Sequence, residues 1–311
     1  MYKYIRSVLA RRTFAHKLRN KAMNTFSSYE IFKSIREKQE QNRQTEKRPH
    51  EVLYFHKVDD PYSHLTVQYL DKLKDSYDIV LKPILVGEEN PETLHEPSLY
   101  NKYCLEDVRR IATYYQIEFA ADSYPPKNLV DLANSILSSV EEENFNNIAR
   151  DVSSALWNSD EEKLKEISSK YSASEDEVNK KLSEGNEIRN ECDYYFGSAF
   201  YYEKELYWGV DRLNHLETRL SELGAKKSLN NELICNLNTI APKELSSEQK
   251  LNLTYFPSLN SPYTFVSAKR VKELAADYPI NLITKPVLPM LMRMMVIPDF
   301  KAKYIISDAA R

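Results

Sequence analysis

Apolar and polar positions along the start of this chain predict a strand, a helix and a second strand. Residues 52–56, VLYFH, form an apolar and aromatic run of strand length. Residues 63–77 place leucine and tyrosine side chains on one helical face, and residues 78–87, DIVLKPILVG, follow as a second strand. Pro83 restricts that strand to a sheet edge or a strand end. The two strands are expected to be parallel, because a helix connects them.

The strand signal disappears over about residues 101–190, where each apolar stretch has helical spacing. Two short aromatic runs, 198–202 and 205–209, then predict a hairpin. Residues 210–223 predict a final helix that stops at Gly224. The order strand, helix, strand, helical block, hairpin and helix predicts an α/β domain with a thioredoxin-like fold and an all-helical insertion.

The opening pattern returns 201 residues later in the chain. Tyr54, Phe55, Pro61, Tyr62, Leu73, Tyr77 and Ile79 match Tyr255, Phe256, Pro262, Tyr263, Leu274, Tyr278 and Ile280. After this run we place two extra residues in the second copy, so that Lys82 and Pro83 align with Lys285 and Pro286. The first offset then returns, and Lys102, Tyr103, Asp107 and Arg110 match Lys303, Tyr304, Asp308 and Arg311.

The chain is therefore divided into four parts. They are a basic helical arm over 1–49, a thioredoxin-like domain over 50–225, a linker over 226–250, and a truncated β-α-β opening of a second thioredoxin-like domain over 251–311. If 311 residues are the natural length, the second sheet keeps exposed edges. We then expect a homodimer, or docking of this segment on the first domain.

Composition mainly excludes several classes of protein and of binding site. The hydrophobic content of 42% and charged content of 29% are ordinary for a folded soluble protein. The chain contains no apolar run of membrane-spanning length and no secretory signal after Met1, so we expect a cytoplasmic protein. Its three cysteines form no C-x-x-C pair, which indicates reduced thiols and no metal site. Its five glycines form no dinucleotide-binding or phosphate-binding loop.

Basic charge is concentrated at the N-terminus. The segment up to Arg48 has thirteen Lys or Arg against four Glu, and the first 21 residues have seven basic residues and no acid. Such an arm suits the acidic body of its own protein or a membrane surface, and in a eukaryote it would also suit a transit peptide. We expect no nucleic-acid partner.

Three longer stretches resemble one protein family. They are YFHKVDDPYSHL at 54–65, YFPSLNSPYTFV at 255–266 and YYFGSAFYYEKELYWGVDRLNHLETRL at 194–220. They look like 2-hydroxychromene-2-carboxylate isomerase and its relative, kappa-class glutathione transferase, in the DsbA-like branch of the thioredoxin superfamily. The W-G-x-D-R-L run from Trp208 to Leu213 is the most specific part. The resemblance covers 52–223 in outline and 252–311 as the first third of a second copy.

The resemblance implies glutathione as the cofactor and an electrophilic small molecule as the substrate. In this family a serine before the P-Y/F-S/T turn hydrogen-bonds the glutathione sulfur, and the thiolate then attacks an electrophilic carbon. A helix N-terminus favours the thiolate form. Ser261 matches this serine in the second copy, and Asp60 stands at its place in the first. An ionised Asp60 has no proton to donate and repels a thiolate, so we expect the first copy to be a poor thiolate site.

The resemblance also implies a loop and an acid that bind glutathione. The family's G-x-P loop is Gly197, Ser198 and Ala199 here. Since a cis bond before a non-proline residue costs about 2.5 to 4 kcal/mol, we expect a trans bond and a reshaped loop. Asp211, followed by Arg212, matches the acid near the γ-glutamyl amine, but an aspartate there also suits a helix N-cap. The candidates in the second copy are Lys285, Lys303 and Asp308.

Other side chains near the turns have a structural explanation beside a chemical one. Ser63 and Thr264 stand at helix starts, where hydroxyls commonly cap the helix. His56 and His64 flank the first turn and would suit acid-base chemistry, yet the sequence offers them no third partner. Aromatic strands are usually core, and Cys104 matches an isoleucine in the repeat, which indicates packing.

Three functions remain in view. The first is a glutathione-dependent isomerase or transferase that uses Ser261, which requires a complete second domain. The second is a non-catalytic tandem scaffold or binding protein, which Asp60 and Ala199 favour. The third is a disulfide oxidoreductase, which has the right fold but lacks a cysteine in either turn.

Overall fold

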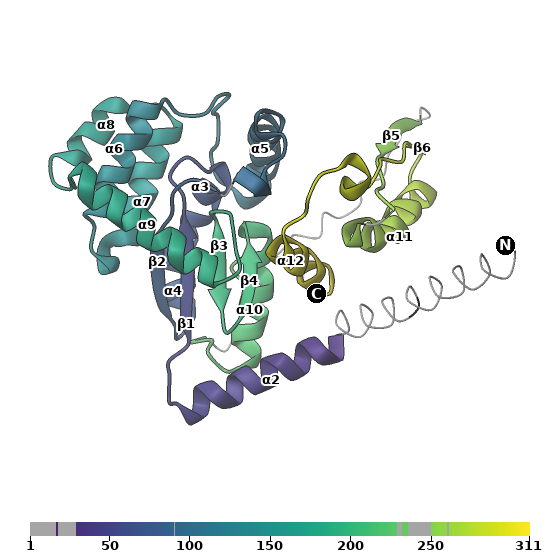
Figure 1. Cartoon of the computed structure of the whole chain (residues 1–311), viewed down its shortest axis with the longest axis horizontal. Helices are drawn as coiled ribbons and strands as arrows, with labels where there is room; N and C mark the ends of the chain where they lie inside the picture. Colours follow the sequence, from purple (N-terminus) through teal and green to yellow (C-terminus); the bar gives the residue numbers. More distant parts are fainter. Residues whose placement is uncertain (1–16, 18–28, 90, 229–231, 236–249, 260) are drawn as a thin grey trace, which may run out of the picture. The chain divides into compact units, whose positions relative to one another are not determined.

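The computed structural model describes residues 17, 29–89, 91–228, 232–235, 250–259 and 261–311. The chain divides into two compact units (Figure 1). The larger unit comprises Arg48–Ser246 and Met290–Lys301, and the smaller unit comprises Met1–Lys47, Ser247–Pro289 and Ala302–Arg311.

The larger unit is built on a four-stranded sheet. Its strands are β1 (Glu51–His56), β2 (Val80–Leu85), β3 (Ala199–Tyr202) and β4 (Glu205–Trp208). They lie in the order β2-β1-β3-β4, with β1 and β2 parallel, β3 antiparallel to β1, and β4 antiparallel to β3. A parallel β-α-β opening joined to an antiparallel hairpin is the arrangement predicted from the sequence, and the thioredoxin-like α/β fold class is confirmed.

Two local details explain how this sheet is made from this sequence. Pro83 pairs with Tyr54 and lies on β2, which is an edge strand, where a missing backbone N–H is tolerated. The hairpin turn uses Glu203 and Lys204, whose φ angles are 44° and 64°. A two-residue turn with both residues at positive φ has the twist that a β-hairpin needs.

The helix predicted over 63–77 is divided in two. It consists of α3 (Pro61–Val67) and α4 (Leu70–Ser76). At the break, the backbone N–H of Tyr69 donates to Thr66 O at 3.0 Å, a tighter turn than the α-helix makes. The Tyr69 hydroxyl donates to Tyr115 O at 2.9 Å, and this bond holds the ring against the neighbouring helical segment.

The chain between β2 and β3 is helical, as predicted. It contains η1 (Pro91–Thr93), α5 (Pro97–Ala112), η2 (Thr113–Tyr115), α6 (Lys127–Ser138), α7 (Glu142–Trp157), α8 (Glu161–Ser168) and α9 (Glu175–Glu191). The first long helix begins at Pro97 rather than near 101, because a proline suits the first turn of a helix. After the hairpin, η3 (Val210–Arg212) leads into α10 (Leu213–Glu222), and Gly224 follows at φ 74° as the predicted stop.

The core of the larger unit joins the sheet to the helices. Tyr54, Phe200, Tyr202 and Tyr207 are fully buried on the strands, so the aromatic hairpin is mainly core. Glu205 and Arg219 form an ion pair at 2.8 Å inside this core, and Arg219 also donates to Tyr202 O at 3.0 Å. The aromatic run therefore serves packing first.

The smaller unit has a two-stranded parallel sheet and helices. Its elements are α2 (Tyr29–Thr45), β5 (Leu251–Tyr255), α11 (Pro262–Asp277) and β6 (Ile280–Thr284). η4 (Met290–Arg293) belongs to the larger unit, and α12 (Asp299–Ala309) begins there and ends in the smaller one. Among the described residues, β5 and β6 pair with each other alone. Dimerisation or docking through their edges stays a prediction.

The pairing of β5 with β6 corrects one detail of the sequence alignment. Tyr54 pairs with Pro83 in the larger unit, and Tyr255 pairs with Thr284 in the smaller one. The same offset of 201 residues therefore holds on both strands, without two extra residues. The match of Lys82 and Pro83 with Lys285 and Pro286 is wrong. It followed the identity of the residues, whereas the pairing of the strands places Thr284 opposite Tyr255, as Pro83 is opposite Tyr54.

Parts of two predicted segments lie outside the described residues. Of the basic arm, Lys17 and the segment from Tyr29 onward are described, and α2 supplies its helix. Of the linker, residues 229–231 and 236–249 are outside, and Ile234 and Cys235 form a turn. No helix within the described ranges is long and apolar enough to cross a membrane.

Candidate functional site

Asp60 organises the first turn by capping α3. Its Oδ1 accepts a hydrogen bond from the Tyr62 N–H at 3.2 Å, and its Oδ2 accepts from the Ser63 N–H at 3.1 Å. The Ser63 hydroxyl donates to the same Oδ2 at 2.8 Å and accepts from the Lys57 N–H at 3.3 Å. The prediction that Ser63 is the cap is wrong, because the carboxylate one residue before the helix reaches two orphan amides at once.

The Asp60 carboxyl has an unusual proton affinity. Burial, assisted by the negative charge of Glu89, raises its pKa to about 7, although Ser63, Lys57 and the Tyr62 amide act in the opposite direction. The carboxyl is therefore partly protonated at neutral pH and fully ionised only above it. The repulsion of a thiolate expected at Asp60 stays a prediction, and its strength should be greatest at alkaline pH, where the carboxyl is ionised.

Near Asp60, the single lysine Lys57 lies among three further carboxylates. Lys57 Nζ is 3.0 Å from Glu89, 3.5 Å from Asp59 and 3.9 Å from Glu88. Burial opposes its charge, but these three acids outweigh burial and raise the pKa of Lys57. Lys57 is therefore paired with the neighbouring acids, which disfavours its use in binding an anionic ligand.

The loop before β3 approaches Asp60 closely. A Cβ at Gly197 would lie 2.8 Å from Lys57 Cβ, 3.0 Å from Ser63 Oγ and 3.1 Å from Asp60 Oδ2, so a side chain does not fit there. No cis peptide bond occurs in the described part of the chain, as predicted for the bond between Ser198 and Ala199.

Ser198 and Ala199 are fully buried, and their contacts are internal. The Ser198 hydroxyl is 2.6 Å from the Thr66 hydroxyl, and the Ser198 carbonyl accepts from the Gly209 N–H at 2.7 Å. Ala199 pairs with Phe55 as the first residue of β3. These contacts hold the sheet and α3 together.

A cavity of about 220 Å³ opens beside Asp60. Its polar wall includes Lys57, Asp59, Asp60, Glu88 and Glu89. Its aromatic wall includes Tyr100, Tyr124, Phe196 and Trp208, and Cys104 also contributes. Burial raises the pKa of the Cys104 thiol to about 12, so this cysteine is a neutral packing group, in agreement with the repeat.

Asp211 and Arg212 do not line this cavity. Both lie in η3, where they form an ion pair with each other. The residue in the cap position of α10 is Arg212, and no side chain caps that helix. The prediction that Asp211 is an N-cap is therefore wrong, since a short 3-10 turn precedes the helix.

Ser261 occupies the matching place before α11. Its φ and ψ of −89° and 126° resemble the −94° and 116° of Asp60, but its side chain makes no capping hydrogen bond. The Thr264 hydroxyl accepts from the Ser258 N–H at 3.0 Å, as Ser63 does from Lys57. Thr264 thus braces the turn rather than capping the helix.

The other candidates of the second copy are only partly brought together. Asp308 is buried, accepts from the Tyr263 hydroxyl at 2.9 Å and pairs with Arg311 at 3.4 Å. Lys285 is exposed just after β6, and Lys303 is exposed on α12. Asp308 therefore positions α12 against α11, and the two lysines are left as candidates for a ligand.

Both histidines near the first turn are structural. His56 is buried with its Nδ1 3.0 Å from the Tyr54 hydroxyl, and burial lowers its pKa to about 3. His64 lies between Ser153 Oγ at 2.9 Å and Glu118 O at 3.2 Å, and burial lowers its pKa as well. Both rings remain neutral under ordinary conditions, which agrees with the structural explanation.

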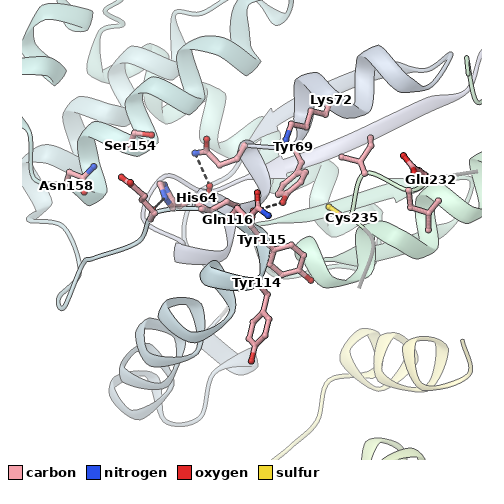
Figure 2. Close-up of a pocket in the computed structure, with 15 residues that line it drawn as sticks. His64, Tyr69, Lys72, Tyr114, Tyr115, Gln116, Ser154, Asn158, Glu232 and Cys235 are labelled. Atoms are coloured by element: carbon pink, nitrogen blue, oxygen red, sulfur yellow. Dashed lines mark hydrogen bonds between the residues drawn. The ribbon is translucent and has the colours of Figure 1, made fainter. Parts of the chain in front are cut away.

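A second, larger pocket of about 730 Å³ lies elsewhere in the larger unit (Figure 2). His64, Tyr69, Lys72, Tyr115 and Cys235 are among its walls, and the Tyr69 hydroxyl is already bonded to Tyr115 O. Burial raises the pKa of the Cys235 thiol, so it is a poor nucleophile. Sequence reasoning missed this pocket because it combines distant segments with no shared motif.

No metal-binding group of three or more His, Cys, Asp or Glu occurs among the described residues.

Comparisons with known proteins find two distant structural likenesses. No protein-family model matches the chain, and no curated protein matches it. A solved 2-hydroxychromene-2-carboxylate isomerase is 20% identical, with a TM-score of 0.44, over 56% of this chain and 96% of its own. A candidate protein disulfide isomerase from Nitrosomonas europaea is 14% identical, with a TM-score of 0.42, over 56% and 96%.

Proposed function

We propose that this chain is a tandem thioredoxin-fold protein of the 2-hydroxychromene-2-carboxylate isomerase type. Its glutathione-dependent chemistry takes place at Ser261, and the turn at Asp60 has lost the capacity to hold a thiolate. The substrate class is a small electrophile, as the sequence resemblance implies. One observation carries the proposal: equivalent turns, built by equivalent bonds, hold a serine in one case and an aspartate in the other.

The equivalence rests on backbone and side-chain contacts that recur at one offset. Tyr54 and Tyr255 each donate to a carbonyl, Ser63 O and Thr264 O, at 3.4 Å. The Val86 N–H donates to His56 O at 2.8 Å, and the Val287 N–H donates to Pro257 O at 2.9 Å. Tyr62 donates to Asp107 at 2.8 Å, and Tyr263 donates to Asp308 at 2.9 Å. These pairs support a common origin for the two turns.

Two features of Ser261 support a thiolate site. It precedes α11, whose 16 residues give the N-terminus a positive end. Its hydroxyl makes no capping bond to the helix, so it can donate to a glutathione sulfur. A donor and a helix N-terminus together lower the pKa of a bound thiol and raise the fraction of nucleophile at neutral pH.

Asp60 provides the opposite environment. Its two oxygens already accept bonds from the start of α3, and Asp59 and Glu89 add negative charge nearby. A thiolate brought to this place would meet like charge at short range, which raises the pKa of the thiol and weakens binding. The Asp60 turn is therefore not proposed as a second catalytic centre.

The proposal is tested by the thiol pKa of bound glutathione, measured through the ultraviolet absorbance of the thiolate. The parent and Ser261→Thr, which keeps a hydroxyl, should lower that pKa below its free value near 8.5. Ser261→Ala should return it toward the free value. Equal curves for the parent and Ser261→Ala, with both proteins folded, would reject Ser261 as the thiolate-stabilising residue.

A second candidate is a non-catalytic tandem scaffold or binding protein. Ser198 and Ala199 favour it, because both are fully buried and present no side chain to a glutathione peptide. Disulfide oxidoreductase chemistry has less support, since Cys104 and Cys235 are buried with raised thiol pKa values and neither turn holds a cysteine. Absence of any glutathione response in the experiment above would favour the binding protein.

A further inference from the structure

The cavity beside Asp60 is too small to enclose glutathione. Its volume of about 220 Å³ lies below the roughly 300 to 1,000 Å³ of pockets that enclose drug-sized ligands. A tripeptide would not be enclosed by it. The ligand that the cavity can enclose is therefore a small one.

One side of the cavity is aromatic. Tyr100 and Phe196 stack with ring centroids 5.6 Å apart, and Phe196 contacts Trp208 at 5.6 Å. Tyr124 completes the aromatic lining. Electron-rich ring surfaces of this kind attract organic cations, and tryptophan is the strongest of them.

The other side of the cavity carries net negative charge. Asp59, Asp60, Glu88 and Glu89 line it, against the single ammonium of Lys57. The nearby Arg189 guanidinium donates to the carbonyls of Gly87 and Glu88 and does not line the cavity. With both cations counted, an ionised Asp60 leaves an excess of two negative charges.

We propose that this cavity binds a small organic cation, an alkylammonium group, whose charge is held by Asp60 and Glu89 and whose carbon atoms pack on the aromatic wall. The combination of carboxylates with aromatic rings in one enclosed volume carries this inference. An anion or a neutral molecule of the same size would gain from the rings alone. The proposal does not depend on glutathione chemistry at Ser261.

The proton affinity of Asp60 gives the binding a pH dependence. The pKa of Asp60 is raised to about 7 by burial and by Glu89, while Lys57, Ser63 and the Tyr62 amide favour the ionised form. A cation binds the ionised carboxyl, so its affinity should rise between pH 6 and pH 8, and binding should release a proton.

Trp208 supplies the readout. The chain has two tryptophans, and Trp157 is buried outside the cavity lining, so Trp157→Phe leaves Trp208 as the sole reporter. The probes are propylammonium, propanol and propionate, which are similar in size and differ in charge. Each is titrated into the full chain at constant ionic strength, and Trp208 fluorescence is recorded.

Two variants and one control make the test specific. Asp60→Asn removes the charge but keeps an acceptor for the cap of α3, and Glu89→Gln changes the other carboxylate. Asp151→Asn neutralises an exposed carboxylate that is absent from the cavity lining. Circular dichroism checks that each variant is folded, and Glu89→Gln keeps the test valid if Asp60→Asn does not fold.

The expected result is a saturable response to propylammonium alone. Its dissociation constant should increase about tenfold or more in Asp60→Asn and in Glu89→Gln, and should stay unchanged in Asp151→Asn. The affinity of the parent should be higher at pH 8 than at pH 6. The proposal is overturned if the three probes respond alike, if propylammonium gives no saturable response, or if both cavity variants bind it as the parent does.

Discussion

The hydroxyl of Tyr62, on α3, donates a hydrogen bond at 2.8 Å to Oδ2 of Asp107, which lies on α5. Tyr62 is buried, and its ring contacts Trp208 with centroids 5.0 Å apart. Through its hydrogen bond and its ring contact, Tyr62 therefore connects the first turn to α5 of the helical insertion and to the hairpin. It is the contact that recurs between Tyr263 and Asp308.

Loss of this hydroxyl should destabilise the larger unit. Tyr62→Phe leaves the Asp107 carboxylate without its shortest partner, and the free energy of unfolding should fall by about 1 to 2 kcal/mol. Tyr103→Phe is the matched control, because its hydroxyl lies 3.5 Å from the other oxygen of Asp107 and the residue is exposed. Urea unfolding measures both. Equal losses in the two variants would contradict the importance of the Tyr62 bond.

Acid should destabilise the protein partly through His56. Its pKa is lowered by burial from 6.5 to about 3, so the unfolded chain takes up a proton first as the pH falls. The contribution of neutral His56 is present above pH 6.5 and is lost progressively toward pH 3. Between pH 7 and pH 5 this costs about 2 kcal/mol.

His56→Asn should remove that loss and flatten the pH dependence of unfolding. His95→Asn, at an exposed histidine, should leave the dependence as it is in the parent. Urea midpoints at pH 5, 6 and 7 give the comparison. If the parent and His56→Asn show parallel slopes, another group is responsible for the acid sensitivity.

The buried ion pair between Glu205 and Arg219 should be costly to break from one side. Arg219→Met leaves Glu205 charged and buried without its 2.8 Å partner, and stability should fall by about 3 to 5 kcal/mol. The double variant with Glu205→Met should recover part of that loss, because no charge is then left unpaired. Additive losses in thermal unfolding would show that the two side chains are not coupled.

Gly197 should tolerate no side chain. Gly197→Ala would bring a Cβ within 2.8 Å of Lys57 Cβ, so the loop must move away from Asp60. We expect lower thermal stability and a loss of the Trp208 response to propylammonium. Gly87→Ala is the control, since its nearest contact would be 3.4 Å, to a side-chain atom of Asn186. Similar behaviour of both variants would refute the close approach at Gly197.

The fold could be predicted because its signals are local and periodic. Short apolar runs predicted β1 and β2, and two aromatic runs predicted the hairpin. The sequence did not show the break in the first helix at Tyr69, where the side-chain hydroxyl bonds to Tyr115 O, 46 residues away. Helix starts were also misjudged at Ser63 and Asp211, where the choice of cap depends on backbone geometry.

The candidate site was predictable in position but not in chemistry. The motif located Asp60 and Ser261 before their helices, and the structure places both there. Enclosure of Asp60 with Glu89 and Trp208 combines three distant segments, so neither the cavity nor the raised pKa of Asp60 had a sequence signal. In the proposed repeat the motif identifies equivalent positions, but the surroundings of each turn decide its chemistry.

The central claim is that Ser261, and not Asp60, holds glutathione. Calorimetry of glutathione binding to the full chain, to Ser261→Ala and to Asp60→Ser tests it most directly. The account predicts binding by the parent, loss of that binding in Ser261→Ala and its retention in Asp60→Ser. No binding by the parent, together with binding gained in Asp60→Ser, would contradict it and would identify the Asp60 turn as a silenced transferase site.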